Sequence, residues 1–167
     1  MVIPFVDEND EIIGYKTLEE IDKGALTYRV AGLWIKNSKD EILLAKRAFT
    51  KSHHPGKWGP AAAGTVEKGE SYKENIIKEA EEELGLKDIN PRIGPKTKSK
   101  SKYKHFTQWF FYEVDKEIKE FKIQEEEVAE IKWFSLEEIK NLLKNNIKEC
   151  IPSLINSFDL LTKSNTK

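Results

Sequence analysis

Cysteine and long apolar runs are scarce in this sequence, and each absence excludes a class of protein. Cys150 is the only cysteine among 167 residues, so the chain can form neither an internal disulfide nor a cysteine cluster for zinc. No apolar run approaches the roughly 20 residues of a membrane-spanning helix. The N-terminus also lacks the basic and then apolar pattern of a secretory signal. These absences predict a cytoplasmic protein that makes no contact with a membrane.

Net charge is also nearly absent. The formal charge is −1, so no overall field draws the chain to nucleic acid, and a nucleic-acid partner is not expected. Hydrophobic residues make up 38% and charged residues 34% of the chain, which suits one soluble globular domain of this length. We expect a single domain over residues 1–162 and a disordered tail over 163–167. We expect a monomer or a homodimer.

The most informative stretch runs from residue 64 to residue 86. A glycine-bearing loop over 64–69 precedes Ser71, which fits a helix N-cap with Glu74 completing a capping box. Apolar residues then recur at helical spacing, and Gly85 stands where a C-cap glycine belongs. The pattern predicts a helix between Ser71 and Gly85.

One face of this expected helix carries an unusual charge pattern. Glu79, Glu82 and Glu83 stand at i, i+3 and i+4, where like charges repel and weaken an isolated helix. Several carboxylates on one face suit a hard divalent cation, Mg²⁺ or Mn²⁺. The alternative interpretation is an acidic helix face that is simply solvated.

The spacing of the whole stretch resembles the Nudix box, G-x5-E-x7-R-E-U-x-E-E-x-G-U, where U is apolar. Such a long gapped pattern is far more specific than a short glycine motif. Lys78 departs from the pattern, because the family has Arg there. Ala80 takes one apolar position, and the outright matches are Gly64, Glu70, Glu79, Glu82, Glu83, Gly85 and Leu86.

This resemblance implies a fold and a chemistry. The fold would be the α/β Nudix type, an α/β/α sandwich with a mixed central β-sheet. The chemistry would be attack of water on a diphosphate linkage, with Mg²⁺ or Mn²⁺ held by Glu79, Glu82, Glu83 and the Gly64 carbonyl. Glu127 matches, by its spacing to Trp133, a further catalytic or metal-binding glutamate of several members. The box support of Glu70 and Lys78 would be less rigid, because Lys cannot copy the bidentate grip of Arg.

The remaining elements follow from local patterns. Apolar and β-branched runs predict strands, while Thr17 and Ser135 each begin a capping box. The expected strands are 2–6, 11–16, 27–36, 41–47, a proline-broken 89–95, 103–115 and the end of 117–134. The expected helices besides the Nudix-box helix are 17–23, 136–145 and 147–161.

Residues 6–26 and 47–58 resemble one branch of the superfamily, that of type I isopentenyl-diphosphate isomerase and its hydrolase relatives. In that branch, residues at the positions of Arg47 and Lys51 bind the substrate diphosphate. A pair of basic side chains suits this role, because each can donate charge-assisted hydrogen bonds to phosphate oxygens. Surface charges at a strand end are the alternative. The isomerase needs a Cys, a His and an earlier His where this chain has Ala63, Thr65 and Tyr28. We therefore expect no isomerase activity, since function depends on site residues and not on fold.

Three further features have weaker readings. His53 and His54 are adjacent and are interpreted as loop residues. Lysines alternate from residue 96 to 104, which fits a solubilising hairpin tip better than an anion-attracting rim or an RNA-binding patch. His105, Phe106 and Trp109 have two competing interpretations. They pack in the core, or they line a pocket in which a base stacks.

Together these features predict a Mg²⁺-dependent Nudix hydrolase that cleaves a diphosphate linkage. The expected substrate is a small nucleoside di- or triphosphate or a related nucleoside diphosphate derivative. Two alternatives stay open, a protein resembling the isomerase and a non-catalytic module that binds diphosphate or RNA.

Overall fold

The computed structural model of the protein describes residues 1–165, and these form one mixed β-sheet with helices on both faces. Nine strands belong to the sheet within this range. Their bounds are β1 Val2–Val6, β2 Ile12–Thr17, β3 Thr27–Lys36, β4 Ile42–Arg47, β5 Trp58–Pro60, β6 Ala62–Thr65, β7 Arg92–Lys98, β8 His105–Glu113 and β9 Val128–Phe134.

The helices begin at the caps that the sequence specifies. Thr17, Ser71 and Ser135 each accept a hydrogen bond from the backbone three residues on, and each forms a complete capping box. Gly85 ends the Nudix-box helix in the left-handed conformation that glycine adopts without strain. The α-helices are α1 Leu18–Gly24, α2 Tyr72–Leu84, α3 Leu136–Asn145 and α4 Pro152–Ser164, and Ile118–Glu120 and Ile147–Glu149 form short 3₁₀ turns.

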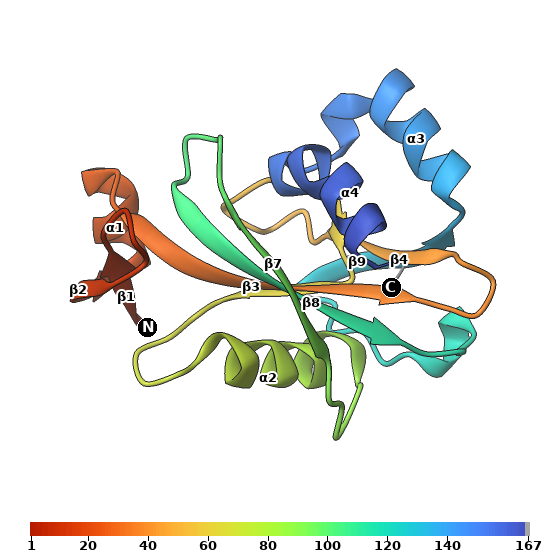
Figure 1. The fold of residues 1–167 in the computed structure, drawn as a ribbon, viewed down its shortest axis with the longest axis horizontal. Coiled ribbons are helices and arrows are strands. Elements are labelled where there is room, and N and C mark those ends of the chain that lie inside the picture. The colour runs from red at the N-terminus through yellow and green to blue at the C-terminus, as the bar shows by residue number, and fades with distance from the viewer. Residues whose placement is uncertain (166–167) are drawn as a thin grey trace.

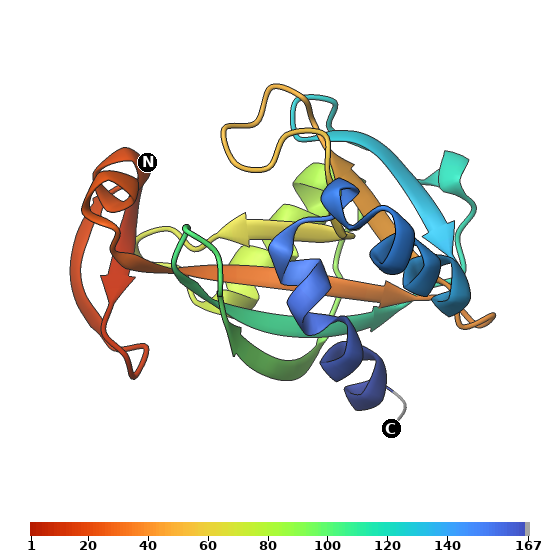
Figure 2. The same ribbon diagram turned by 90° about the horizontal axis from the view of Figure 1, so that it is seen from above.

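The layers are those of an α/β/α sandwich. Figure 1 shows α2 below the sheet and α3 and α4 above it, and Figure 2 shows the β1–β2 hairpin and α1 projecting at one end. Two apolar cores result, because alternate residues of each strand point to opposite faces. The core facing α2 includes Leu33, Ile76 and Leu84, and the core facing α3 and α4 includes Trp34, Trp109 and Leu154.

Strand β3 organises the sheet. It pairs in parallel with β8 from Tyr28 to Lys36 and antiparallel with β1, β4 and β6. The mixed sheet predicted from the family resemblance is therefore confirmed. Strand β9 pairs with β4 so that Val128 lies opposite Arg47. This pairing brings the segment 124–127 beside the loop that follows β4.

Some expected elements differ from the structure. The short strands β5 and β6 were not predicted, and Gly64 lies in β6 and not in a loop. The proline-containing segment forms β7 with a bulge between Ile93 and Lys96, where the pairing register shifts. Helix α4 begins later than expected, at Pro152, because proline suits the first helical position.

The expected disordered tail is wrong for residues 163–165. Helix α4 continues to Ser164, and the buried side chain of Asn165 accepts a hydrogen bond of 3.1 Å from Arg92. Residues 166–167 lie outside the described residues. Within the described residues, no helix is long and apolar enough to cross a membrane.

A buried carboxylate joins the N-terminal hairpin to the rest of the fold. Asp10 accepts hydrogen bonds from Arg29 Nε at 2.8 Å, Tyr72 Oη at 2.8 Å and Lys96 Nζ at 2.6 Å. Burial opposes its charge, but these three donors outweigh burial and lower the pKa of Asp10. The hairpin, β3, α2 and β7 therefore meet at one ionised group.

We expect Asp10→Asn to lower the free energy of unfolding at pH 7 by about 2 kcal/mol, because Arg29 and Lys96 lose their anionic partner. Asn tolerates the positive φ of 62° at this position, so the backbone is not strained. The folded-state pKa is lowered, so the wild-type advantage is complete above about pH 4 and is lost as pH falls through the folded-state pKa. Urea unfolding at pH 7 and near pH 2 tests this, and an equal deficit at both values would contradict the charge origin.

Candidate active site

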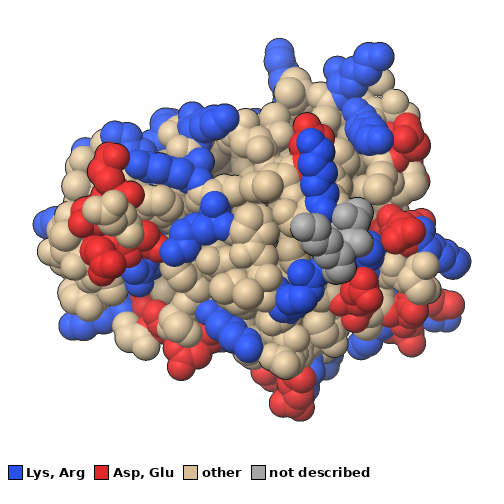
Figure 3. Space-filling model, viewed as in Figure 1, with Lys and Arg blue, Asp and Glu red and all other residues tan. Residues whose placement is uncertain are grey.

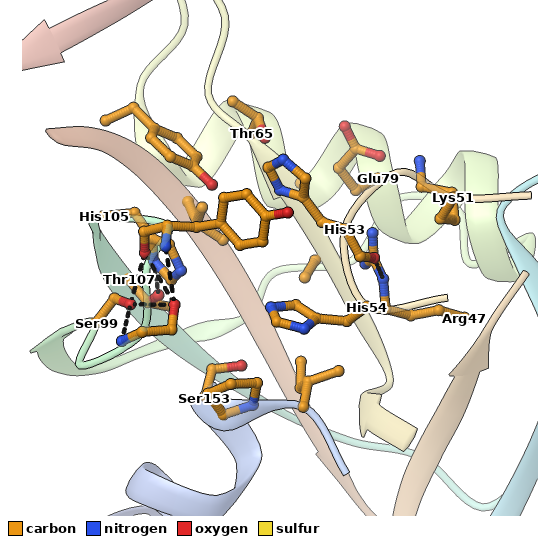
Figure 4. Close-up of a pocket in the computed structure, with 18 of the residues that line it drawn as sticks. Arg47, Lys51, His53, His54, Thr65, Glu79, Ser99, His105, Thr107 and Ser153 are labelled. Carbon is orange, nitrogen blue, oxygen red and sulfur yellow. Dashed lines mark hydrogen bonds between the residues drawn. The ribbon is translucent and has the colours of Figure 1, made fainter. Parts of the chain in front are cut away.

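A cavity of about 370 Å³ opens between α2, the loop after β4, the turn between β7 and β8, and the start of α4. Figure 4 shows Glu79, Lys51 and Arg47 on one side of this cavity and His105, Thr107 and Ser99 on the other. The acidic helix face and the basic loop, which are far apart in the sequence, therefore line one space.

Helix α2 presents its glutamates to the cavity. Glu79, Glu82 and Glu83 all line it, as the helical spacing predicts. Glu79 packs directly on Gly64 of β6, where an added Cβ would lie 2.5 Å from Glu79 Cδ and Oε1. The glycine of the Nudix box is therefore required by a close approach, because any side chain here would displace Glu79.

Two glutamates on this face of α2 have raised pKa values, because they are buried and lie close to other carboxylates. Burial, and then repulsion from Glu82, raises the pKa of Glu79 to about 7. Burial, and then Glu79 and Glu127, raises the pKa of Glu83 well above its ordinary value. Among residues 1–165, the Ala63 N–H is the one hydrogen-bond donor to the Glu83 carboxylate, at 3.4 Å. These carboxylates lack a cationic partner that would offset their repulsion fully.

Lys78 stands where the Nudix box has arginine, and it contacts two carboxylates of the turn between β6 and α2. Its ammonium contacts Glu70 directly and lies 3.7 Å from Glu67. Burial disfavours the charge on both Lys78 and Glu70, but their contact raises the pKa of Lys78 and lowers that of Glu70. Glu70 also accepts from Asn75 Nδ2 and from the Glu67 N–H, both at 2.9 Å. This network holds the turn between β6 and α2.

The basic pair lies where the sequence predicts it. Arg47 Nε donates to the His53 carbonyl at 2.8 Å, and Lys51 Nζ lies 2.5 Å from Glu127 Oε2. The Ala48 N–H also donates to the Glu127 carbonyl at 3.0 Å. Arg47, Lys51 and Glu127 therefore share the cavity with the glutamates of α2.

The donor set fits a divalent cation in its chemistry. It consists of carboxylate oxygens, which Mg²⁺ and Mn²⁺ prefer. Burial, and then mutual repulsion, raises the pKa of Glu79 and Glu83, and a bound cation would offset both effects. Across residues 1–165, no three His, Cys, Asp or Glu side chains are drawn together into a ready ligand group. Glu127 is directed to Lys51 and Glu83 to the Ala63 N–H, so cation binding requires these side chains to turn.

Sequence reasoning missed several lining residues. His53 and His54 are loop residues, as interpreted, but both also line the cavity. The His53 ring stacks on Tyr103 with centroids 3.6 Å apart, and its Nε2 lies 2.8 Å from Asp22 Oδ2. No sequence signal pairs these residues, because three separate segments supply them.

A pocket for a stacked base competed with core packing for three residues of β8; only one of the three lines the cavity, and core packing holds for Trp109. His105 lines the cavity, but Trp109 is fully buried and donates from its indole to Thr97 at 2.9 Å. Phe106 does not line the cavity and lies under Lys98, whose Nζ is 5.4 Å from the ring centroid. Alternation along β8 places neighbouring aromatics on opposite faces, so the three could not share one pocket wall.

The lysine run is not one continuous basic stripe. Strand β7 ends at Lys98, so only the first two lysines are on it, and Lys96 is held by Asp10. On the face in Figure 3, basic and acidic side chains are interspersed, with basic side chains beside the hollow between the β7–β8 turn and α4.

The family of the chain is established by comparison. The model of the NUDIX domain matches residues 26–154, and the chain belongs to this family. Residues 26–154 include the whole cavity wall formed by α2 and by the loop after β4.

The similar curated proteins are also Nudix hydrolases by name. The chain is 36% identical over 87 residues to the uncharacterized Nudix hydrolase PA4841 of Pseudomonas aeruginosa, a match covering 52% of each protein. It is 31% identical to the uncharacterized Nudix hydrolase lmo0368 of Listeria monocytogenes, with 82% of this chain and 81% of the relative aligned. The chain thus spans about half the length of the first relative and most of the second.

Solved structures show the same fold. The protein DR0079 of Deinococcus radiodurans superposes with a TM-score of 0.79 at 20% identity, covering 98% of this chain and 99% of that one. The MutT protein of Methanosarcina mazei superposes with a TM-score of 0.69 at 26% identity, covering 84% and 96%. The Nudix-type sandwich predicted from the box is confirmed.

Proposed function

We propose that the protein is a metal-dependent hydrolase of a diphosphate linkage in a small nucleoside diphosphate derivative. One observation carries this proposal. Four carboxylates and two basic side chains line a single cavity, and they come from α2, from the end of β4 and the loop after it, and from the segment before β9. Acidic groups that hold a metal, beside basic groups that grip phosphate oxygens, are what phosphoryl chemistry requires.

Each group has a distinct role in this proposal. Glu79, Glu82, Glu83 and the Gly64 carbonyl would hold Mg²⁺ or Mn²⁺, and the bound cation would neutralise phosphate charge and favour ionisation of a water molecule. Arg47 and Lys51 bind the oxygens of the diphosphate. Glu127 holds the Lys51 ammonium in place and can accept a proton in the same space.

The fold neighbours and the family support hydrolysis over the other two classes. Isomerase chemistry needs a thiol that moves protons, and Ala63 has none. A binding module without catalysis would not require the crowded carboxylates of α2. Free nucleoside di- and triphosphates are the first substrates to test, followed by nucleotide sugars and dinucleotides.

A screen of these compounds with detection of released phosphate or pyrophosphate tests the proposal. We expect turnover with Mg²⁺, none after chelation with EDTA, and recovery when Mg²⁺ is restored. Arg47→Ala should raise KM about tenfold, since a charge-assisted contact to the diphosphate is lost. Turnover that survives chelation would contradict the metal role, and conversion of isopentenyl diphosphate to its dimethylallyl isomer would contradict the choice of class.

A further inference from the structure

The N-terminal segment 1–25 precedes the matched NUDIX domain, which begins at residue 26. This segment forms β1, β2 and α1, and Figure 2 shows these elements projecting at one end of the sheet. Met1 and Leu18 nevertheless line the cavity. The segment therefore reaches the candidate active site although it lies outside the matched domain.

The loop after β4, residues 48–57, has a fixed base and a separate tip. At the base, the Arg47 N–H donates to the Lys57 carbonyl at 2.9 Å. The tip, residues 52–54, lies beyond this bond and lines the cavity. Arg47 also reaches the tip, because its Nε donates to the His53 carbonyl at 2.8 Å. The position of the Arg47 guanidinium therefore depends on where the tip lies.

The His53 ring holds the tip between two distant segments. It stacks on Tyr103 of the β7–β8 turn with ring centroids 3.6 Å apart. Its Nε2 lies 2.8 Å from Asp22 Oδ2 of α1, and Nε2 is the donor because an ionised carboxylate only accepts. The His53 side chain is 16% exposed and that of Asp22 29%, so water competes weakly for this bond. We call Asp22, His53 and Tyr103 the His53 clamp.

Both partners of the His53 ring are themselves fixed. Ile21, the neighbour of Asp22, is fully buried and anchors α1. The Tyr103 carbonyl accepts from Ser99 Oγ at 2.7 Å, which holds the β7–β8 turn. The tip of the loop, in contrast, belongs to neither a helix nor a strand. The ring therefore transmits the rigidity of two fixed segments to an irregular one.

The tip also has a backbone conformation that needs support. His54 has a φ of 49°, in the left-handed region that residues other than glycine rarely adopt. Such a conformation persists only where surrounding contacts impose it. The His54 ring meets the edge of Tyr103 with centroids 5.5 Å apart, so both histidines of the tip rest on one tyrosine. The clamp thus holds a conformation that the loop would not keep by itself.

We propose that the N-terminal segment takes part in the active site by holding the diphosphate-binding loop through Asp22 and His53. His53 is a positioning residue that acts through Arg47, and Asp22 and Tyr103 hold its ring. This inference rests on the proposed diphosphate chemistry, in which Arg47 and the loop residue Lys51 bind phosphate oxygens. It gives a role in that chemistry to a segment outside the matched domain.

Hydrogen–deuterium exchange of the full chain tests the clamp without any substrate. In His53→Ala and Asp22→Ala, the amides of residues 49–54 should exchange at least about tenfold faster than in the wild type, because the tip is released. The amides of α2 and β3 should be unchanged. Asp22→Asn keeps an oxygen that accepts from Nε2, so its loop should exchange near the wild-type rate. Unchanged exchange of the loop in His53→Ala would overturn the clamp.

Calorimetric binding of methylenediphosphonate with Mg²⁺ tests what the clamp does for the site. His53→Ala keeps the carbonyl that accepts from Arg47, so any loss of affinity must come from movement of the loop. We expect His53→Ala and Asp22→Ala to weaken binding about tenfold, and Asp22→Asn to keep most of the affinity. In an Arg47→Ala background, His53→Ala should cost about twofold or less, because its effect passes through Arg47. Equal losses in both backgrounds would overturn the positioning role.

Glu19→Ala is the matched control. It also removes a carboxylate from α1, but Glu19 pairs with the exposed Lys23 and does not line the cavity, so loop exchange and affinity should be unchanged. If the wild type binds no probe with Mg²⁺, the proposed function and the positioning role fail together, and the exchange rates still decide whether the clamp holds the loop. If His53→Ala binds the probe as tightly as the wild type, only the positioning role fails.

Discussion

Replacing Glu82 or Glu83 with glutamine is expected to lower kcat by about a thousandfold or more while the protein stays folded. Glutamine keeps the shape of the side chain but cannot supply the negative charge that a divalent cation needs. Metal assistance contributes several kcal/mol to such reactions, and each 1.4 kcal/mol corresponds to a factor of ten in rate. Initial rates with Mg²⁺ on the best substrate of the screen measure the effect.

Thermal unfolding separates this loss from damage to the fold. Glu83 is buried, and its pKa is raised well above the ordinary value by burial and by Glu79 and Glu127. Removing its carboxyl relieves that repulsion, so Tm should be unchanged or higher in Glu83→Gln.

Glu81→Gln is the control for activity. Glu81 lies on the same helix, is exposed and does not line the cavity, so this variant should keep full activity. Full activity in both Glu82→Gln and Glu83→Gln would refute the metal assignment.

Gly64→Ala is expected to lower kcat/KM by about a hundredfold. The new methyl would occupy the space of the Glu79 carboxylate, 2.5 Å from its Cδ, so Glu79 must swing away from β6. A displacement of about 1 Å at a catalytic group costs about this factor. Steady-state kinetics across a range of Mg²⁺ concentrations should show that more metal is needed for half-maximal rate.

The same substitution should leave the fold largely intact, because Glu79 is a flexible side chain and its movement relieves the overlap. We expect Tm to change little, so activity and stability separate. Gly24→Ala provides a control, since its added methyl would lie 3.2 Å from Leu26 Cγ, outside the cavity. Wild-type kinetics in Gly64→Ala would show that the close approach of β6 to Glu79 is not needed for activity.

Local signals account for the elements that were predicted well. The expected strand 27–36 and helix 136–145 coincide with β3 and α3, and the Ser71 cap and the Gly85 stop bound α2. Each depends on residues within a few positions of one another, such as a capping box or an apolar period. The cavity position of Glu79, Glu82 and Glu83 follows from the same helical spacing.

Contacts between distant segments account for what was missed. Strands β5 and β6 are only three and four residues long and exist because β4 and β3 pair with them. For Trp109 the sequence left core packing and a pocket wall as competing interpretations, and the packing of α4 on the sheet places it in the core. Asn165 was assigned to a tail, but Arg92 of β7, 73 residues away in the chain, holds it in place.

The sequence alone determined the acidic helix, its caps, the basic pair at Arg47 and Lys51, and the family, because each is written in short-range spacing. Only the tertiary structure decided which of these groups meet. The pairing of β9 with β4 brings Glu127 to Lys51, the approach of β6 places Gly64 against Glu79, and α4 supplies Ser157 to a cavity that no local pattern foretells. The physical reason is that side-chain period fixes the face a residue occupies, whereas strand pairing and helix packing fix what that face touches.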